Sequence, residues 1–260
     1  MTEYIDQMKR TIRLDSSPRR IVSLVPSQTE LLYDLNLGQE VVGITKFCIH
    51  PEVWFRSKER VGGTKKVDIE KVKQLQPDLI IGNKEENTRE DIELLERVAP
   101  VWMSDIFTLE DSLDMIVQVG QITNRVDEAI EIHNSIVAEF EKLETQVGNQ
   151  YFSCLYFMWK DPYFTVGSNT FIDDMIQRIG GKNLQQQARY PIYEFNDNDQ
   201  PDVVFLSTEP YPFASEHVAF FQRKFPNAKV VLVDGEMFSW YGSRLQKVPS
   251  YFLNLLREIK

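Results

Sequence analysis

One short pattern occurs twice in this chain, about half the chain apart. Glu70 stands seven residues before the run Pro77-Asp78-Leu79-Ile80-Ile81, and Glu194 stands seven residues before Pro201-Asp202-Val203-Val204-Phe205. Proline disfavours helix in the residue before it, and an apolar run rich in branched residues is typical of a strand covered on both faces. Each copy is therefore predicted to be a short helix with an acid in its first turn, a proline that ends it, and a buried strand. The repetition indicates two similar lobes.

The length and the charge of the chain limit what it can be. The 260 residues are enough for two α/β lobes of about 100 to 130 residues each. The 29 basic and 39 acidic residues give a net charge of −10, which argues against nucleic acid and anionic membrane surfaces as partners. We expect an acidic, globular, monomeric protein with a small-molecule ligand.

Neither the first residues nor the cysteines provide a targeting or metal signal. Residues 1–14 lack the apolar stretch and small-residue cleavage site of a secretory signal, and no transmembrane run occurs. Cys48 and Cys154 lie far apart without the spacing of a zinc site, so we expect buried free thiols and no metal site. On this basis the protein either works in the cytoplasm or starts after a removed leader.

Apolar runs alternate with helical patterns through both halves, which favours parallel sheets. The expected strands are 21–25, 41–44, 79–82, 101–103, 151–157, 203–206 and 230–233. Ser27-Gln28-Thr29-Glu30 has the pattern of a capping box for the first helix. Ser168 is expected to cap a later helix, and residues 215–224 and 244–259 are expected to be helical.

One long helix is predicted between the halves. Apolar residues recur at helical spacing from Ile130 to Leu143, with Glu and Lys between them. The predicted fold class is α/β, with two doubly wound parallel-sheet lobes joined by one long α-helix and a ligand cleft between the lobes. The expected boundaries are 1–122 for the N-terminal lobe, 123–148 for the linking helix and 149–260 for the C-terminal lobe.

The sequence carries no recognisable catalytic constellation. Gly62-Gly63 lacks the spacing of a phosphate-binding loop, and neither a GxSxG nor an HExxH motif occurs. Of the three histidines, only His50 lies in a predicted loop on the cleft side, and no nucleophile and base accompany it. We expect no enzyme activity, no catalytic residue and no cofactor, with a two-lobed α/β enzyme as the alternative from another class.

Aromatic residues gather in loops that follow the strands of the second half. Ligands of parallel sheets bind outside the carboxyl ends of the strands, and many large rings there suit a bulky, partly flat ligand. The candidate ligand-binding residues of this half are Trp159, Tyr163, Phe164, Tyr211, Phe213, Trp240, Tyr241 and Arg244. Those of the first half are Ser27, Gln28 and Phe47. Arg244 is the directional anchor for an anionic or amide-rich group.

Every candidate also has a purely structural explanation. The rings can pack the protein interior, Ser27 can cap its helix, and Arg244 can pair with Asp234 or Glu236. Acids are stabilising in the first turn of any helix, which would account for Glu70 and Glu194. Their equal distance from a Pro-Asp-strand unit is what favours a functional role.

Four motifs make the chain resemble a known family. They are Arg20-Ile21-Val22-Ser23-Leu24-Val25-Pro26-Ser27-Gln28-Thr29-Glu30, Val61-Gly62-Gly63, Pro77-Asp78-Leu79-Ile80, and Phe171-Ile172-Asp173 with Gly180-Gly181-Lys182-Asn183. From about Arg19 onward the chain resembles the helical-backbone (class III) periplasmic substrate-binding proteins of ABC importers. It is most similar to the cobalamin-binding and ferric siderophore-binding branch.

The resemblance implies a function and places some residues in it. The implied function is to hold a corrinoid or related metal complex for an ABC-type importer, with a ferric siderophore or haem as the alternative ligand. Glu70 and Glu194 match the acids that dock on the permease in this family, and Trp240 and Arg244 lie in a loop that helps line the ligand crevice. The family implies a periplasmic or cell-surface location.

Overall fold

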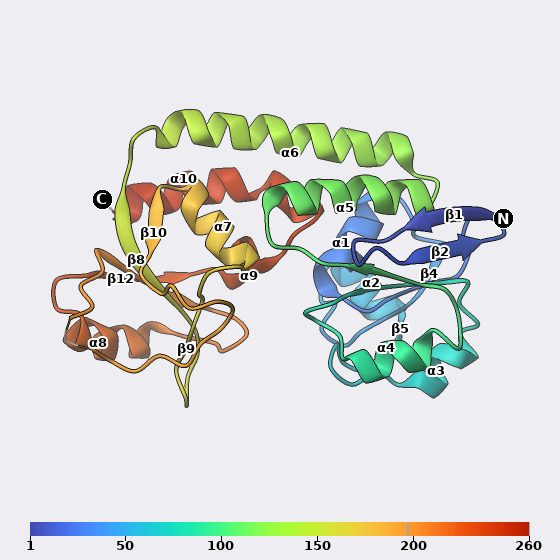
Figure 1. Cartoon of the computed structure of the whole chain (residues 1–260), viewed down its shortest axis with the longest axis horizontal. Coiled ribbons are helices and arrows are strands. Elements are labelled where there is room, and N and C mark those ends of the chain that lie inside the picture. The colour runs from blue at the N-terminus through green and yellow to red at the C-terminus, as the bar shows by residue number, and fades with distance from the viewer. Residues whose placement is uncertain (197, 260) are drawn as a thin grey trace. The chain divides into compact units, whose positions relative to one another are not determined.

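A computed structural model describes residues 1–196 and 198–259 (Figure 1). Contacts divide the chain into two compact units. Unit 1 contains Met1–Ile106, Glu110–Ile136 and Tyr241–Arg244, and unit 2 contains Phe107–Leu109, Val137–Trp240 and the chain from Leu245 onward. Both units are built from a mainly parallel sheet with helices, so the predicted α/β class is confirmed.

Unit 1 has a parallel sheet in the order β5-β4-β3-β6-β7. Its strands are β3 (Ile21–Ser23), β4 (Val41–Ile44), β5 (Glu59–Arg60), β6 (Leu79–Asn83) and β7 (Val101–Ser104). Its helices are α1 (Pro26–Asp34), α2 (Glu52–Ser57), α3 (Ile69–Gln74), α4 (Arg89–Leu95) and nearly all of α5 (Leu109–Ile122). The strands β3, β6 and β7 are buried along their whole length, as expected for a sheet covered on both faces.

Unit 2 has a parallel sheet in the order β10-β8-β11-β12, with β9 antiparallel to β8. Its strands are β8 (Phe152–Trp159), β9 (Phe164–Thr165), β10 (Gly181–Asn183), β11 (Val203–Ser207) and β12 (Lys229–Val233). Its helices are α7 (Phe171–Arg178), α8 (Ser215–Lys224), α9 (Gly235–Ser239), the 3-10 helix η1 (Ser243–Gln246, shared with unit 1) and α10 (Val248–Ile259).

The long helix predicted between the halves is present as α6 (Val126–Val147). Its residues up to Ile136 belong to unit 1, and those from Val137 belong to unit 2. The expected boundaries at 122/123 and 148/149 stay a prediction. No helix in residues 1–196 or 198–259 is both long and apolar enough to cross a membrane.

The repeated Pro-Asp pattern has the same structural role in both units. In unit 1 the Asp78 carboxylate accepts hydrogen bonds from the backbone N–H groups of Arg19 and Arg20, at 2.8 Å each, just before β3. In unit 2 the Asp202 carboxylate accepts from the Ser153 N–H and hydroxyl, at 2.7 Å each, at the start of β8. Asp78 thus links β6 to its parallel neighbour β3, and Asp202 links β11 to its parallel neighbour β8.

The helix predicted around Glu194 is wrong. Glu70 does lie in the first turn of α3, but Glu194 lies in an irregular, exposed segment. The backbone there is bonded elsewhere: Ile192 forms a bridge with Phe164, and the Tyr193 N–H donates to the Tyr163 carbonyl. Pairing with β9 has replaced the local hydrogen bonds of a helix.

Three predicted helix starts are also wrong. Helix α1 begins at Pro26, and its N-cap is Val25 without a side-chain cap, because proline at the first position needs no hydrogen-bond partner. Helix α7 is capped by Thr170, not Ser168. The last α-helix begins at Val248, and Arg244 lies in the 3-10 helix before it.

A hairpin at the N-terminus was not predicted. Strands β1 (Thr2–Ile5) and β2 (Thr11–Leu14) pair antiparallel. The turn between them covers the edge strand β7: the Gln7 N–H donates to the Met103 carbonyl, and the buried Asp6 carboxylate accepts from the Met103 N–H. The hairpin thus satisfies part of an edge that would otherwise be open to another strand.

Candidate functional site

The topology marks one place in each sheet where a ligand would be expected. In open parallel sheets ligands bind at the carboxyl ends of the two adjacent strands from which the chain winds in opposite directions. In unit 1 these strands are β3 and β6, and in unit 2 they are β8 and β11.

Unit 2 presents two aromatic rings at this place. Trp159 is the last residue of β8 and is 41% exposed, and Tyr211 follows β11. Their rings meet edge to face with centroids 5.9 Å apart, and the Tyr211 N–H donates to the Met158 carbonyl. We call Trp159 and Tyr211 the aromatic ledge. It joins the ends of the two strands and offers a large apolar surface.

Two of the other predicted rings pack the interior of unit 2. Phe213 is 3% exposed and belongs to the core cluster around Phe157 and Phe221. Tyr163 packs against that cluster and stacks on Phe220 at 5.8 Å. Interior packing accounts for the positions of both rings. The position of the half-buried Phe164 is explained by the pairing of β9 with β8. A ligand contact by these residues stays a prediction.

Trp240 is held by a carboxylate that follows β11. It is 8% exposed, and its indole N–H donates to Glu209 Oε1 at 3.0 Å. The Ser239 hydroxyl donates to the same oxygen at 2.9 Å. Burial raises the pKa of the Glu209 carboxyl to about 7 against the effect of these two hydrogen bonds, and the nearby carboxylate of Glu236 raises it further. Glu209 thus joins the end of β11 to α9 and titrates near neutral pH.

The candidates at the ends of β3 and β6 in unit 1 form a buried polar cluster. Gln28 is 1% exposed, and its Nε2 donates to the Ser104 hydroxyl at 2.6 Å and to the Gly82 carbonyl at 3.2 Å. Ser27 and Tyr241 are also buried. Burial raises the pKa of Tyr241 well above its usual value, and the carboxylate of Glu86 raises it further. These side chains hold the strand ends and the 241–244 segment together.

Arg244 is paired inside unit 1. It is 7% exposed, its Nε lies 2.7 Å from Glu30 Oε2, and its Nη2 lies 3.2 Å from Glu30 Oε1. An acid partner for Arg244 was expected as the structural alternative, but Glu30 was assigned to a helix cap. This two-point contact fixes the planar guanidinium. A direct contact of Arg244 with ligand stays a prediction.

Phe47 is the exposed aromatic candidate of unit 1. It follows β4, it is 50% exposed, and the Lys46 ammonium lies 5.0 Å from its ring centre. The residue therefore offers an apolar face with a positive charge beside it.

The two predicted docking acids are both exposed. Glu70 lies in the first turn of α3, and its carboxylate is 2.6 Å from the Lys73 ammonium. A pair so exposed contributes little to stability and leaves the acid accessible. Glu194 is exposed in the segment before β11.

The cysteines are free and buried, as predicted. Burial raises the pKa of both thiols, so neither is a reactive thiolate. Within the described residues, His, Cys, Asp and Glu side chains form no group of three or more that could hold a metal ion.

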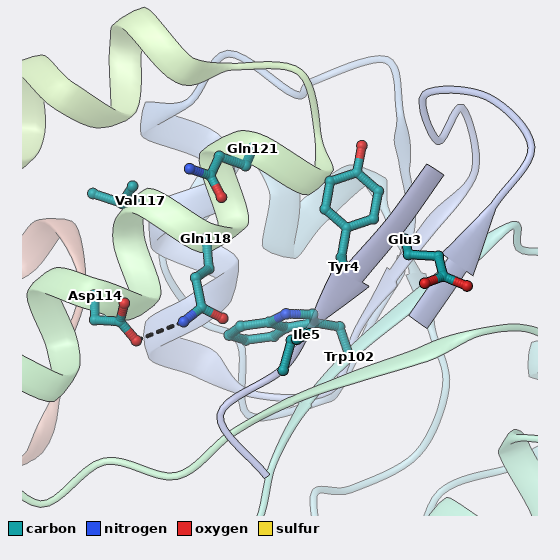
Figure 2. A pocket seen from close by; sticks show the side chains of 8 residues that line it. All are labelled: Glu3, Tyr4, Ile5, Trp102, Asp114, Val117, Gln118 and Gln121. Carbon is teal, nitrogen blue, oxygen red and sulfur yellow. Dashed lines mark hydrogen bonds between the residues drawn. The ribbon is translucent and has the colours of Figure 1, made fainter. Parts of the chain in front are cut away.

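A separate cavity of about 360 Å³ lies in unit 1 beside the N-terminal hairpin (Figure 2). It is lined by Glu3, Tyr4, Ile5, Trp102, Asp114, Val117, Gln118 and Gln121. Its acids are already engaged, because Glu3 pairs with Arg13 and Asp114 accepts from Gln7 and Gln118. None of the predicted ligand-binding residues lines it.

The sequence patterns did not indicate Glu209 or Ser104 as site residues, and they predicted Glu30 as part of a helix cap. Ser104 is the last residue of β7, a strand predicted to end one residue earlier, at 103. A systematic inspection of the residues directly after each strand would have found Glu209 and Ser104. The pairing of Glu30 with Arg244 joins positions far apart in sequence and has no local signal.

Comparisons with known proteins agree on the family. The model of the family described as "Periplasmic binding protein" matches residues 21–229. A vitamin B12-binding protein of Vibrio campbellii is 28% identical over 198 residues, which cover 73% of this chain and 70% of the relative. The vitamin B12-binding protein of Pectobacterium carotovorum is 24% identical over 236 residues, covering 88% of this chain and 84% of the relative.

Solved structures share the fold. The periplasmic vitamin B12-binding protein of Vibrio cholerae has a TM-score of 0.80 at 22% identity, over 94% of this chain and 98% of its own. A periplasmic haem-binding protein in complex with two haems has a TM-score of 0.80 at 20% identity, over 94% and 99%. The siderophore-binding protein BauB, bound to acinetobactin and ferric iron, has a TM-score of 0.81 at 17% identity, over 100% and 98%. This chain belongs to the periplasmic binding protein family.

Proposed function

We propose that this protein is a solute-binding protein that holds a corrinoid, or a related flat metal complex, and delivers it to an ABC-type importer. The observation that carries the proposal is the aromatic ledge of Trp159 and Tyr211, at the carboxyl ends of β8 and β11. The proposal is supported by the membership of the chain in the periplasmic binding protein family. Several relatives that match over most of the chain are named vitamin B12-binding proteins.

The ledge suits a large planar ligand for a physical reason. Aromatic rings bury 150–250 Å² each and lose little conformational freedom when they are covered, so they bind flat apolar faces well. Trp159 is already oriented by its contact with Tyr211, which reduces the entropy lost on binding. Phe47 in unit 1 offers a second exposed ring with Lys46 beside it.

Haem and ferric siderophores are the second candidate ligands. Both are flat or globular metal complexes that an aromatic surface can cover. Proteins of the same fold are described as bound to haem and to a ferric siderophore complex.

Glu70 and Glu194 are proposed as the contacts to the permease, because both are exposed and stand seven residues before the two Pro-Asp units. The proposed function includes no catalytic step. It assigns the protein, as a monomer, to the outside of the cytoplasmic membrane.

The test is ligand titration with a matched pair of variants. Wild-type protein is titrated by calorimetry with cyanocobalamin, haemin and a ferric catecholate, and tryptophan fluorescence is followed in parallel. We expect cyanocobalamin to bind, and Trp159→Ala to weaken it at least tenfold, as loss of one well-placed ring costs about 1.4 kcal/mol or more. Tyr151→Ala is the control, because Tyr151 is 69% exposed and stands before β8, at the opposite end of the strand.

Two results would contradict the proposal. One is the absence of heat and quenching with every ligand of the series. The other is an equal effect of Trp159→Ala and Tyr151→Ala, which would remove the ledge from the binding site.

A further inference from the structure

Glu209 has one carboxylate oxygen engaged and one available. Its Oε1 accepts the hydrogen bonds of Ser239 and Trp240. Its Oε2 accepts no hydrogen bond from the part of the chain that the structure describes, and those residues do not enclose it. The side chain stands two residues before Tyr211, at the carboxyl end of β11. A fixed acceptor therefore lies on the same sheet edge as the aromatic ledge.

The surroundings of Glu209 are negative. The charges that shift its pKa are the carboxylates of Glu236 on α9 and Asp234 at the N-cap of that helix, and both raise it. On the β8 side stands the Tyr156 hydroxyl, which donates to Ser207 and whose pKa burial raises far above neutral. His217 on α8 is within hydrogen-bond distance of the Tyr211 hydroxyl, at 3.3 Å, and is a second ionisable side chain beside the ledge.

We propose that Glu209 is a specificity-determining ligand contact, whose Oε2 accepts a hydrogen bond from an amide or other neutral donor of the ligand and whose charge disfavours ligands with carboxylate or catecholate groups. This inference rests on the proposed function and narrows its ligand class. The proposed contact at Glu209 favours an amide-bearing corrinoid over haem, which carries propionates, and over an anionic siderophore.

The physical basis is the cost of leaving charges and polar groups unmatched. A hydrogen bond to a charged acceptor is stronger than one to a neutral acceptor, whereas two like charges in a half-buried site repel each other. Because Oε1 is held by two donors, the carboxylate cannot turn away from an anionic ligand without losing them. An anionic ligand should therefore bind better once Glu209 is protonated.

Glu209→Gln tests this with two ligands of opposite character. In the variant the amide oxygen keeps the Ser239 and Trp240 bonds, so the amide NH₂ replaces Oε2 and presents a donor in place of an acceptor. Binding of cyanocobalamin should weaken about tenfold or more, as expected for the loss of a hydrogen bond to a charged acceptor. Binding of haemin at pH 8 should tighten by a similar factor, since the repelling charge has gone.

The pH profile is the second readout. Wild-type affinity for haemin should rise from pH 8 to pH 6 by several-fold, because Glu209 is ionised at the upper pH and mostly protonated at the lower one. Glu209→Gln should lack this rise. Glu216→Gln removes an exposed acid on α8 and should behave as the wild type. His217→Gln should retain the rise, which would show that the rise does not depend on His217.

Failure of the proposed role of Glu209 and failure of the proposed function give different results. If Glu209→Gln shifts both ligands in the same direction, Glu209 only positions Trp240 and the inference is overturned. The same holds if the pH profile is lost in His217→Gln and kept in Glu209→Gln. If wild-type protein binds neither ligand at either pH, the proposed function itself fails, and the inference fails with it.

Discussion

Arg244 and Glu30 lie 214 positions apart and form a buried ion pair within unit 1. The sequence pattern predicted Arg244 as a ligand anchor and Glu30 as part of a helix cap. Arginine is a suitable ligand anchor and glutamate a suitable capping residue, so both predictions were chemically reasonable. Whether these side chains are buried depends on packing between distant segments, and a local sequence pattern carries no information about such packing. A buried pair is costly to break because the remaining charge loses its partner.

Removal of one partner should therefore destabilise the protein strongly. We expect Glu30→Ala to lower the free energy of unfolding by about 3 kcal/mol, because it leaves the Arg244 guanidinium buried without this carboxylate. Urea denaturation followed by circular dichroism measures the change. Glu52→Ala is the control, since the side chains of the Glu52–Arg56 pair are 71% and 75% exposed and such pairs contribute under about 1 kcal/mol. Equal effects of the two substitutions would show that the buried pair contributes no more to the free energy of unfolding than the exposed pair.

Elements with strong local signals were predicted well. Helix α8 has the predicted bounds of 215–224, and the strands β4, β6 and β11 lie at or within one residue of their predicted bounds. The failures have long-range causes. The hairpin β1–β2 is stabilised by its contact with β7, and the segment around Glu194 is held by β9. Neither contact is visible in a local window of sequence.

The repeated aspartates give a prediction at the scale of the strand pair. Hydrogen bonds from the Ser153 backbone and hydroxyl lower the pKa of Asp202 below its ordinary value of 3.8. A carboxyl with a lowered pKa stabilises the fold above its unfolded pKa, and this contribution is lost as the pH falls through the folded pKa. We expect Asp202→Asn to lower the free energy of unfolding at pH 7 by about 1 kcal/mol. The difference from the wild type should shrink below about pH 3.8.

Thermal unfolding at pH 7, 5 and 3.5 measures this difference. Asp78→Asn should lower the free energy of unfolding at pH 7 by a similar amount, because the Asp78 carboxylate also accepts two hydrogen bonds, in unit 1. Asp15→Asn, an exposed aspartate, is the control. A destabilisation by Asp202→Asn that is the same at all three pH values would mean that the charge of the carboxylate is not what ties β11 to β8.

At the scale of the whole molecule, the sequence predicted the class of fold and the edge of each sheet at which candidate residues gather. It did not separate exposed candidates from buried ones. Trp159 and Phe47 are exposed, whereas Gln28, Phe213 and Arg244 are buried. Trp159, Phe47, Gln28 and Phe213 all lie at or within a few residues after a strand end, so their positions in the sequence do not distinguish exposed from buried candidates. What differs is whether another segment covers the side chain, as residues 241–244 do within unit 1.

The proposed partnership with a permease gives the last prediction. Glu70→Ala and Glu194→Ala should each weaken binding to the cognate importer reconstituted in lipid nanodiscs by about tenfold, since each removes one charged contact worth about 1.4 kcal/mol. Both side chains are exposed and outside the aromatic ledge, so the affinity for cyanocobalamin should stay unchanged. Surface plasmon resonance measures the first quantity and calorimetry the second. Glu93→Ala, which removes another exposed acid of unit 1, should leave both unchanged. Loss of ligand binding in Glu70→Ala or Glu194→Ala would contradict the docking role, because an acid that serves only the importer has no reason to affect the ligand.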